Sequence, residues 1–463
     1  MGGLFGILGN SASALAAFQR ALNVSQNNVG NASTPGYARQ TQPLEALAFN
    51  PAVGLTGGVR AGQLQSTRSE YAEQGVRTQQ ELLGSFSAQS QALSAIEPIF
   101  DVSGQSGIDG ALSQLFTSFS AWSAAPTDTN ARQDVLSKAQ NVAAAFQDAA
   151  AGLAKTTQSV NQQLGATVQQ INSLAATIRD YNVAIRQGGQ TDAGVDANLH
   201  AALESLSQQA DIAVRFESDG TATVLLGGQT PLVIGDQQNA ISLTVTNAAH
   251  VFDSNGIDIT SQISQGSLGG LLSVRNTALP SLQGDGTQPG ALNQLAQKVA
   301  DRVNQILSSG LVSAGPPAQA GQALFAYSAS SPAATLKLDP NITAAKLAAI
   351  DPGPPQVANG IAVTLSNLGN STAAADQING QTILQFYSSI AAQVGQQVAN
   401  ANDGTDVHTQ LLAQAQSIRT QISGVSLDQE ATAVLELQRG YQAASKMVSV
   451  IDTLTQSLID MPV

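Results

Sequence analysis

The chain has 463 residues, and its 19 basic and 32 acidic residues leave a net charge of −13. This acidic balance argues against nucleic-acid binding and against a peripheral membrane role, because nucleic-acid phosphates and anionic lipids repel a negative surface. Cysteine is absent, which excludes disulfides, thiol nucleophiles and cysteine-ligated metals, and no apolar run reaches the roughly 20 residues of a membrane span.

The first 30 residues predict a helix with a coiled-coil seam. Leu8, Leu15, Leu22 and Val29 fall seven residues apart, and Phe18 occupies an intermediate position. Such a face is not stable alone in water and needs a partner. An amphipathic helix packed on a globular core is the alternative interpretation. We expect no cleaved secretory signal, because the first basic residue of this apolar start is Arg20.

The next part of the chain is also helical. Helices are expected around Ser69–Ile96, Ile108–Trp122 and Asn130–Phe146. Two heptad rows between Leu153 and Ile185 predict one long helix of about nine turns. Gln381–Ile422 is predicted to return as a helix, in which Asn402–Gly404 marks a candidate break.

Between residues 212 and 370 the pattern favours strands and turns. Ala213–Phe216 and Thr221–Leu226 flank an Asp-Gly pair and predict a β-hairpin, and short strands are expected to follow. Nine of the 16 prolines lie between Pro280 and Pro355, which argues against a helical bundle there. Asn293–Leu307 is a predicted helix within this stretch.

The C-terminal segment predicts a second seam. Ser426 followed by Gln429 is a capping-box pattern, and Gly424 before it ends the preceding helix. The apolar positions of this helix recur at heptad spacing in two rows. They are Leu427, Val434, Tyr441 and Val448, with Leu437, Ala444, Ile451 and Leu458 three residues after members of the first row.

No catalytic, cofactor or metal site is predicted. His200, His250 and His408 are far apart in the sequence and lack metal-ligand spacing, so each is expected to be a surface or turn residue. Asp253, Asn255 and Asp258 around Gly256 lack the glutamate that completes a calcium loop, and an Asn-Gly hairpin is the preferred interpretation. We therefore expect a protein without enzymatic activity.

The most informative motif follows the first helix. Asn27, Asn28 and Asn31 compete for backbone hydrogen bonds and are expected to end that helix. Thr34-Pro35-Gly36-Tyr37 fits a type II turn, with proline second and glycine third. Tyr37, Arg39 and Gln40 then lie on an extended segment and could present a ring, a guanidinium and an amide to a neighbour.

This motif resembles the signature shared by flagellar rod, hook and hook-associated axial proteins. The Arg39-Gln40 pair after it is most similar to the first hook-associated proteins, which join the hook to the filament. The C-terminal run from Ser423 to Ala444 resembles the same group. Trp122 with Pro126 and Arg132, the segment Gly266–Arg275 and the segment Leu292–Asn304 are also similar.

The resemblance implies a polymerising structural protein of the bacterial flagellum. In such a protein the terminal helices pair as a coiled coil, long helices form a bundle, and a β-rich insert faces outward. The implied partners are other copies of the chain, the hook protein, the third hook-associated protein, the flagellar type III export apparatus and a chaperone of the C-terminal helix. The implied location is the hook–filament junction, outside the cell.

The expected fold class is thus mainly α with an inserted β-rich domain. Three parts are predicted: residues 1–65 with 425–463 as the terminal coiled-coil and turn region, 66–211 with 371–424 as the long-helix bundle, and 212–370 as the insert. Two alternative functions stay open. The chain could be a hook or rod subunit, or a secreted scaffold whose insert has adhesin or hydrolase activity.

Overall fold

The computed structural model describes residues 2–50, 55–102, 106–189 and 192–460. The chain is mainly helical with small antiparallel sheets, which confirms the predicted fold class. Its contacts divide it into two compact units. The first comprises Met1–Leu82, Ile171–Ala240 and His408–Val463, and the second comprises Leu83–Gln170 and Ile241–Val407. None of the described helices is long and apolar enough to cross a membrane.

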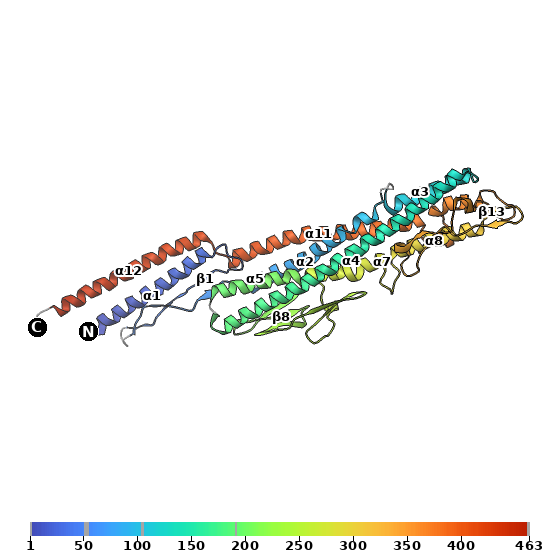
Figure 1. The fold of residues 1–463 in the computed structure, drawn as a ribbon. Coiled ribbons are helices and arrows are strands. Elements are labelled where there is room, and N and C mark those ends of the chain that lie inside the picture. The colour runs from blue at the N-terminus through green and yellow to red at the C-terminus, as the bar shows by residue number, and fades with distance from the viewer. Residues whose placement is uncertain (1, 51–54, 103–105, 190–191, 461–463) are drawn as a thin grey trace. The chain divides into compact units, whose positions relative to one another are not determined.

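In the first unit the two ends of the chain lie side by side (Figure 1). Helix α1 (Gly2–Gly30) pairs with helix α12 (Leu427–Ile459), as the two predicted seams require. Ala17 and Ala21 of α1 and Ile451 of α12 are buried. The pairing of the terminal helices, which the family resemblance implied, is therefore confirmed within a single chain.

The first unit also contains the start of helix α2 (Glu70–Ser94) and all or part of three further helices. They are helix α5 (Ala193–Gln209), the last part of helix α4 (Thr129–Arg186) and the last part of helix α11 (Ile383–Ser423). Helix α5 was not among the sequence predictions. Its start is fixed by Asp192, whose carboxylate accepts hydrogen bonds from the backbone of Gly194 and Val195.

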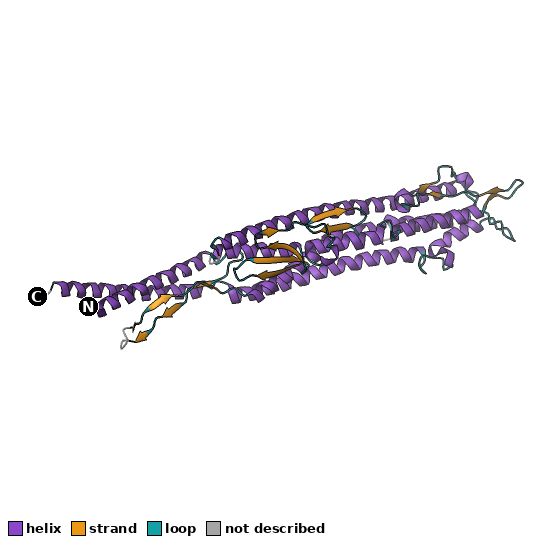
Figure 2. Ribbon diagram, turned by 90° about the horizontal axis from the view of Figure 1, so that it is seen from below, coloured by secondary structure: helices purple, strands orange, loops and turns teal. Residues whose placement is uncertain are grey.

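The strands of the first unit form a four-stranded sheet of order β10-β9-β8-β7 and three two-stranded ribbons, β1-β6, β2-β5 and β3-β4 (Figure 2). The hairpin predicted around Asp219-Gly220 is confirmed by the antiparallel register of β7 with β8. The side chain of Asn182 on α4 binds this sheet at Ala222. Its Nδ2 donates to the Ala222 carbonyl, and its Oδ1 accepts from Ala222 N, each at 2.8 Å. The strands are β1 (Gln40–Thr41), β2 (Leu44–Ala46), β3 (Phe49–Asn50), β4 (Leu55–Thr56), β5 (Val59–Ala61), β6 (Gln65–Ser66), β7 (Ile212–Phe216), β8 (Ala222–Leu226), β9 (Thr230–Ile234) and β10 (Gln237–Gln238).

The second unit combines helices with short hairpins around a core that includes Trp122 and Phe146. Trp122 Nε1 and Arg132 Nε both donate to the Pro126 carbonyl, which brings together three residues that the sequence singled out. The helices, including one π segment (η5), are α3 (Gly107–Ala124), α6 (Gly266–Ser273), η5 (Val274–Ala278), α7 (Leu279–Gln283), α8 (Ala291–Ser309), α9 (Pro332–Thr335) and α10 (Gly360–Asn367). The strands are β11 (Ser242–Val245), β12 (Ala249–Phe252), β13 (Leu311–Ser313), β14 (Gln319–Ala320), β15 (Phe325–Ala326) and β16 (Lys337–Leu338). Short 3-10 turns are η2 (Glu97–Phe100), η4 (Thr260–Gln262), η6 (Ala344–Lys346), η7 (Leu368–Asn370) and η8 (Ala374–Asp376).

Two predicted helix boundaries were wrong. The segment Asn130–Phe146 is not a separate helix but the first part of α4, which continues to Arg186. The candidate break at Asn402–Gly404 does not occur, and α11 runs through it. Gly404 serves packing instead, because a Cβ there would lie 2.4 Å from the ring of Phe86.

The predicted insert contributes to both units. Residues 212–240, with β7 to β10, belong to the first unit, and residues 241–370 belong to the second. The three-part domain division proposed from sequence stays a prediction.

Candidate functional site

The asparagine segment ends α1 as predicted. Asn31 N donates to the carbonyls of both Asn27 and Asn28, and the Asn31 side chain donates back to the Asn27 carbonyl at 3.0 Å. The chain then turns, and Tyr37 N donates to the Thr34 carbonyl at 3.2 Å. Gly36 has a φ of 73°, so the predicted type II turn with glycine in third position is confirmed.

The side chain of Asn28 holds the segment that follows the turn. It is 1% exposed, its Nδ2 donates to the Gln40 carbonyl at 2.8 Å, and its Oδ1 accepts from Gln40 N at 2.9 Å. The amide thus pairs with Gln40 as a strand neighbour would. Tyr37 also donates its hydroxyl to Asn28 Oδ1 at 2.9 Å. Burial, and then the nearby Glu430 carboxylate, raise the pKa of Tyr37 and keep its hydroxyl a donor.

Arg39 and Glu430 join the motif to the start of α12. Arg39 Nε donates to Glu430 Oε1 at 2.6 Å, and the Ser25 hydroxyl of α1 donates to Glu430 Oε2. The Glu430 side chain is only 2% exposed. Its burial opposes ionisation, but hydrogen bonds from Ser25, Arg39 and Asn28 outweigh burial and hold the pKa of the carboxyl below its ordinary value.

The link between α11 and α12 is clamped by the same segment. Arg39 N donates to the Ser423 carbonyl at 2.8 Å, and Ser69 N donates to the Ser423 hydroxyl oxygen at 3.1 Å. Thr67 N donates to the Arg39 carbonyl at 2.9 Å. The N-terminal segment after the motif, the start of α2 and the end of α11 therefore meet at Ser423.

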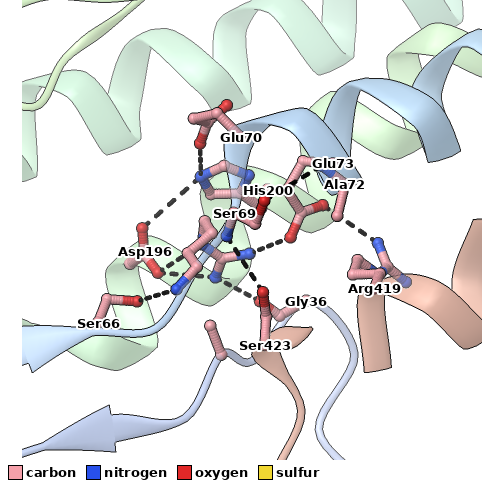
Figure 3. A network of polar contacts seen from close by, with 12 residues as sticks. Gly36, Ser66, Ser69, Glu70, Ala72, Glu73, Asp196, His200, Arg419 and Ser423 are labelled. Atoms are coloured by element: carbon pink, nitrogen blue, oxygen red, sulfur yellow. Dashed lines mark hydrogen bonds and ion pairs between the residues drawn. The ribbon is translucent and has the colours of Figure 1, made fainter. Parts of the chain in front are cut away.

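A buried ionic network lies beside this clamp (Figure 3). Arg68, whose side chain is 7% exposed, donates to the Gly36 carbonyl at 2.6 Å and to the carboxylates of Glu73 and Asp196. Glu73 also accepts from Arg419 of α11 at 3.2 Å. Because each buried charge has an opposite partner, the network fixes the turn against α2, α5 and α11 without leaving an uncompensated ion.

Gly36 makes the closest contact between the turn and α5. A Cβ at this position would lie 2.3 Å from the Ala197 carbonyl oxygen, a separation that no side chain tolerates. Together with the positive φ, this contact explains why glycine is required here.

His200 is buried under the network, so its predicted surface or turn location was wrong. It lies on α5, is 3% exposed, and stacks on Phe216 of β7 with ring centroids 5.1 Å apart. Burial, followed by the positive charges of Arg68, Arg77 and Arg419, lowers the pKa of His200 well below 6.5. The ring is therefore neutral at pH 7. Of the other two histidines, His250 contacts Asp258 at 2.8 Å.

The predicted seam residues divide between inner and outer faces of the α1–α12 pair. Half-buried or buried positions are Leu8, Leu15, Phe18, Leu22, Val434, Leu437, Ala444, Val448 and Ile451. Val29, Leu427 and Tyr441 are exposed by 43%, 55% and 37%. Leu458 belongs to α12, but its side chain lies outside the described residues. Phe18 packs on Gly440, where a Cβ would lie 2.9 Å from its ring.

Several residues of this site were not predicted. Glu430, Arg68, Glu73, Asp196 and Arg419 come from four separate helices or their flanks, and no local spacing relates them. Their contacts depend on the tertiary fold. Ser423 and Glu430 fall within the C-terminal run whose resemblance was noted, which was the one available signal.

The arrangement is suited to holding chain segments together. Within the described parts of the chain, no group of three or more His, Cys, Asp or Glu residues could hold a metal ion. The charged groups at the motif are paired with each other, and asparagine and serine side chains bind backbone or carboxylate groups.

Comparisons with known proteins agree with this geometry. Residues 93–325, slightly more than half of the chain, match the family described as flagellar hook-associated protein FlgK helical domain. Residues 8–37 match the flagella basal body rod protein family, and residues 419–461 match the flagellar basal body rod FlgEFG protein C-terminal family. The first of these matches covers α1 from Leu8 and the motif as far as Tyr37, and the second covers the Ser423 link and α12.

Individual relatives are also similar. Flagellar hook-associated protein 1 of Bacillus subtilis strain 168 is 26% identical over 96% of this chain and 96% of its own length. Flagellar hook-associated protein 1 of Salmonella typhimurium strain LT2 is 27% identical over 64% of this chain and 56% of its own length. The structure of the flagellar hook junction protein FlgK from Burkholderia pseudomallei aligns with a TM-score of 0.63 at 17% identity, covering 76% of this chain and all of that one.

Proposed function

The chain belongs to the flagellar hook-associated protein FlgK family, and we propose that it is a structural axial subunit that polymerises at the hook–filament junction and allows the filament to grow on the hook. The observation that carries the proposal is the pairing of α1 with α12, which leaves apolar residues on the outer face of the pair. An assembly of neighbouring subunits would cover that face.

Large apolar side chains are exposed to water on the α1–α12 pair. Exposed apolar residues follow α12 along its length: Leu427, Leu435, Tyr441, Met447, Val450 and Leu454. Helix α1 carries a single charged residue, Arg20. Exposed apolar side chains of this kind gain stability when the helices of neighbouring subunits bury them.

We propose that the motif residues Asn27, Asn28, Asn31, Thr34, Pro35, Gly36, Tyr37, Arg39 and Gln40 set the geometry of this pair for assembly. Their side chains and backbone connect the end of α1 to the start of α12 and to the Ser423 link. The apolar seam residues then provide the packing surface. Since the motif acts within one chain, its role is to hold the terminal helices in the orientation that neighbouring subunits require.

The proposed partners follow from family membership. They are other copies of this chain, the hook protein on one side and the third hook-associated protein on the other. We also propose export through the flagellar type III apparatus, with a chaperone that binds α12 before assembly. The exposed apolar row of α12 supports the chaperone proposal, because such a surface needs cover before the polymer forms.

Immunogold electron microscopy of detached flagella tests the proposed location. An antibody against residues 212–370 is expected to label a narrow band between hook and filament. Label along the whole hook would indicate a hook subunit instead, and label at the base would indicate a rod subunit. Absence of label from every flagellum, with the protein present in the cell, would overturn the proposal.

A further inference from the structure

An uncharged groove lies between α2 and α11 in the first unit. Tyr71, Gly75 and Thr78 of α2 and Ala415 and Ile418 of α11 line a hollow of about 390 Å³. Tyr71 is 85% exposed and Ile418 is 43% exposed. Leu411 and Ile422 extend the apolar row along α11, with exposed fractions of 38% and 51%.

The α11 side of this groove lacks exposed charge, and Glu70 beside Tyr71 on α2 is paired with Arg77. Between Thr409 and Ile422 the only charged residue is Arg419, and it points inward to Glu73 and Glu204. In a chain with a net charge of −13, two copies repel each other over most of their surface. An uncharged apolar groove is therefore a place where a second copy can approach at low electrostatic cost.

Exposed apolar side chains are also present on the ribbons formed by β2, β3, β4 and β5, which we together call the arm. Phe49 on β3 is 74% exposed, and Leu44 on β2 is 39% exposed. Phe49 lies over Gly57, where a Cβ would be 3.0 Å from its ring, so the ring crosses the ribbon instead of folding into a core. The formal charges of the arm are Glu45 and Arg60, which pair across the strands at 2.9 Å.

We propose that the groove between α2 and α11 receives the arm of a second copy of this chain, with Phe49 as the inserted group. The exposure of both Phe49 and Tyr71 means that the arm does not fill the groove of its own chain. Because the arm and the groove are different surfaces, the contact is heterologous and can repeat from subunit to subunit. The proposal rests on the proposed function, since it requires copies that assemble.

The absence of cysteine from the chain permits a direct test by cross-linking. Two variants are co-expressed, Ala48→Cys on the arm and Thr78→Cys in the groove, both at exposed positions. Detached flagella are treated with a short bis-maleimide. A cross-linked dimer is expected only when both variants are present. Arg215→Cys, on the 80% exposed Arg215 side chain of β7, replaces Thr78→Cys in the control pair and is expected to give none.

A second pair of variants tests the chemistry of the contact. Phe49→Ser, added to the Ala48→Cys chain, and Ile418→Glu, added to the Thr78→Cys chain, are expected to abolish the dimer, because the first removes the inserted ring and the second places a charge in the groove. Dimer formation unaffected by both changes, or cross-linking of Ala48→Cys only to itself, would overturn the proposal. A normal immunogold band without the dimer would reject the arm contact and leave the junction function standing. Loss of the band with unmodified protein would reject the junction function itself.

Discussion

Arg39 and Glu430 lie 391 residues apart in the sequence, and Arg39 Nε donates to Glu430 Oε1 over 2.6 Å. This ion pair joins the end of the N-terminal motif to the first turn of α12. Its carboxylate is buried and its guanidinium is 30% exposed, so the pair lies at the rim of the α1–α12 contact. Because Ser25 of α1 binds the same carboxylate, one side chain connects both terminal helices and the motif.

Arg39→Ala is therefore expected to loosen the start of α12. The substitution removes the cation from a buried carboxylate and should cost about 1–3 kcal/mol of local stability. Hydrogen exchange of the peptide 427–437 in detached flagella measures it, and faster exchange is expected. Arg60→Ala is the control, because the Arg60–Glu45 pair is exposed and such pairs contribute about 0–1 kcal/mol. Equal exchange in the two variants would argue against a linking role for Arg39.

The close contact of Phe18 with Gly440 gives a second prediction. Gly440→Leu is expected to separate α1 from α12 at this level, because a Cβ alone would already lie 2.9 Å from the Phe18 ring. Cells carrying this variant should assemble few filaments, as counted by electron microscopy. Gly9→Leu is the matched control on α1, where a Cβ meets nothing within 4 Å. Normal filament numbers with Gly440→Leu would show that the helices pair differently in the flagellum.

Much of the fold could be predicted because its signals are periodic and local. Heptad rows predicted α1, α12 and the long helix α4, and the Asp219-Gly220 turn predicted the β7–β8 hairpin. The boundaries that failed depend on tertiary contacts. Gly404 was interpreted as a helix break, whereas it provides room for Phe86 in a continuous helix. Helix α5 was missed although Leu199, Leu203 and Leu206 recur at helical spacing and are buried.

Only the motif residues of the candidate site could be predicted from the sequence. Asn28, Gly36 and Arg39 could be identified because they lie in one compact motif. Their partners could not, because Glu430, Arg68 and Asp196 are brought to the motif from distant elements. His200 was predicted to be a surface or turn residue because the sequence around a single histidine does not indicate whether its side chain is buried. Its location depends on Phe216, which belongs to a strand that follows α5.

Gly36→Ala is expected to detach the motif turn from α5. The change combines a left-handed backbone, which costs a non-glycine residue about 1–2 kcal/mol, with a contact of 2.3 Å to the Ala197 carbonyl. Gly228→Ala separates the two effects, because Gly228 has a φ of 71° and no atom within 4 Å of its Cβ position. Thermal unfolding of the purified chains should show a larger loss for Gly36→Ala. If the two variants lose equal thermal stability, backbone strain alone explains the effect, and the contact with Ala197 contributes nothing.

Glu81 is expected to destabilise the first unit at alkaline pH. Burial, opposed in part by the hydrogen bond from Ile212 N, raises the pKa of Glu81 to about 7. The folded chain therefore holds a proton here that an unfolded carboxyl releases near pH 4.5, and this contribution to stability is lost as pH rises through 7. Glu81→Gln, which keeps an acceptor for Ile212 N, should raise the thermal midpoint more at pH 8 than at pH 5. An equal change at both pH values would contradict this.

His200 should make the same unit sensitive to acid. In the unfolded chain the imidazole binds a proton below pH 6.5, whereas burial and then the neighbouring arginines keep the pKa of the folded residue well below that value. Since the unfolded state binds more protons, stability falls as pH drops below 6.5, by up to about 1.4 kcal/mol per pH unit. The effect opposes that of Glu81, so it is best measured in the Glu81→Gln chain. His200→Met in that background fills the space beside Phe216 without a titrating group. The thermal midpoint of the double variant should then change less between pH 6.5 and pH 5 than that of Glu81→Gln alone. If the two chains lose stability equally over that interval, protonation of another group in the first unit causes the acid sensitivity.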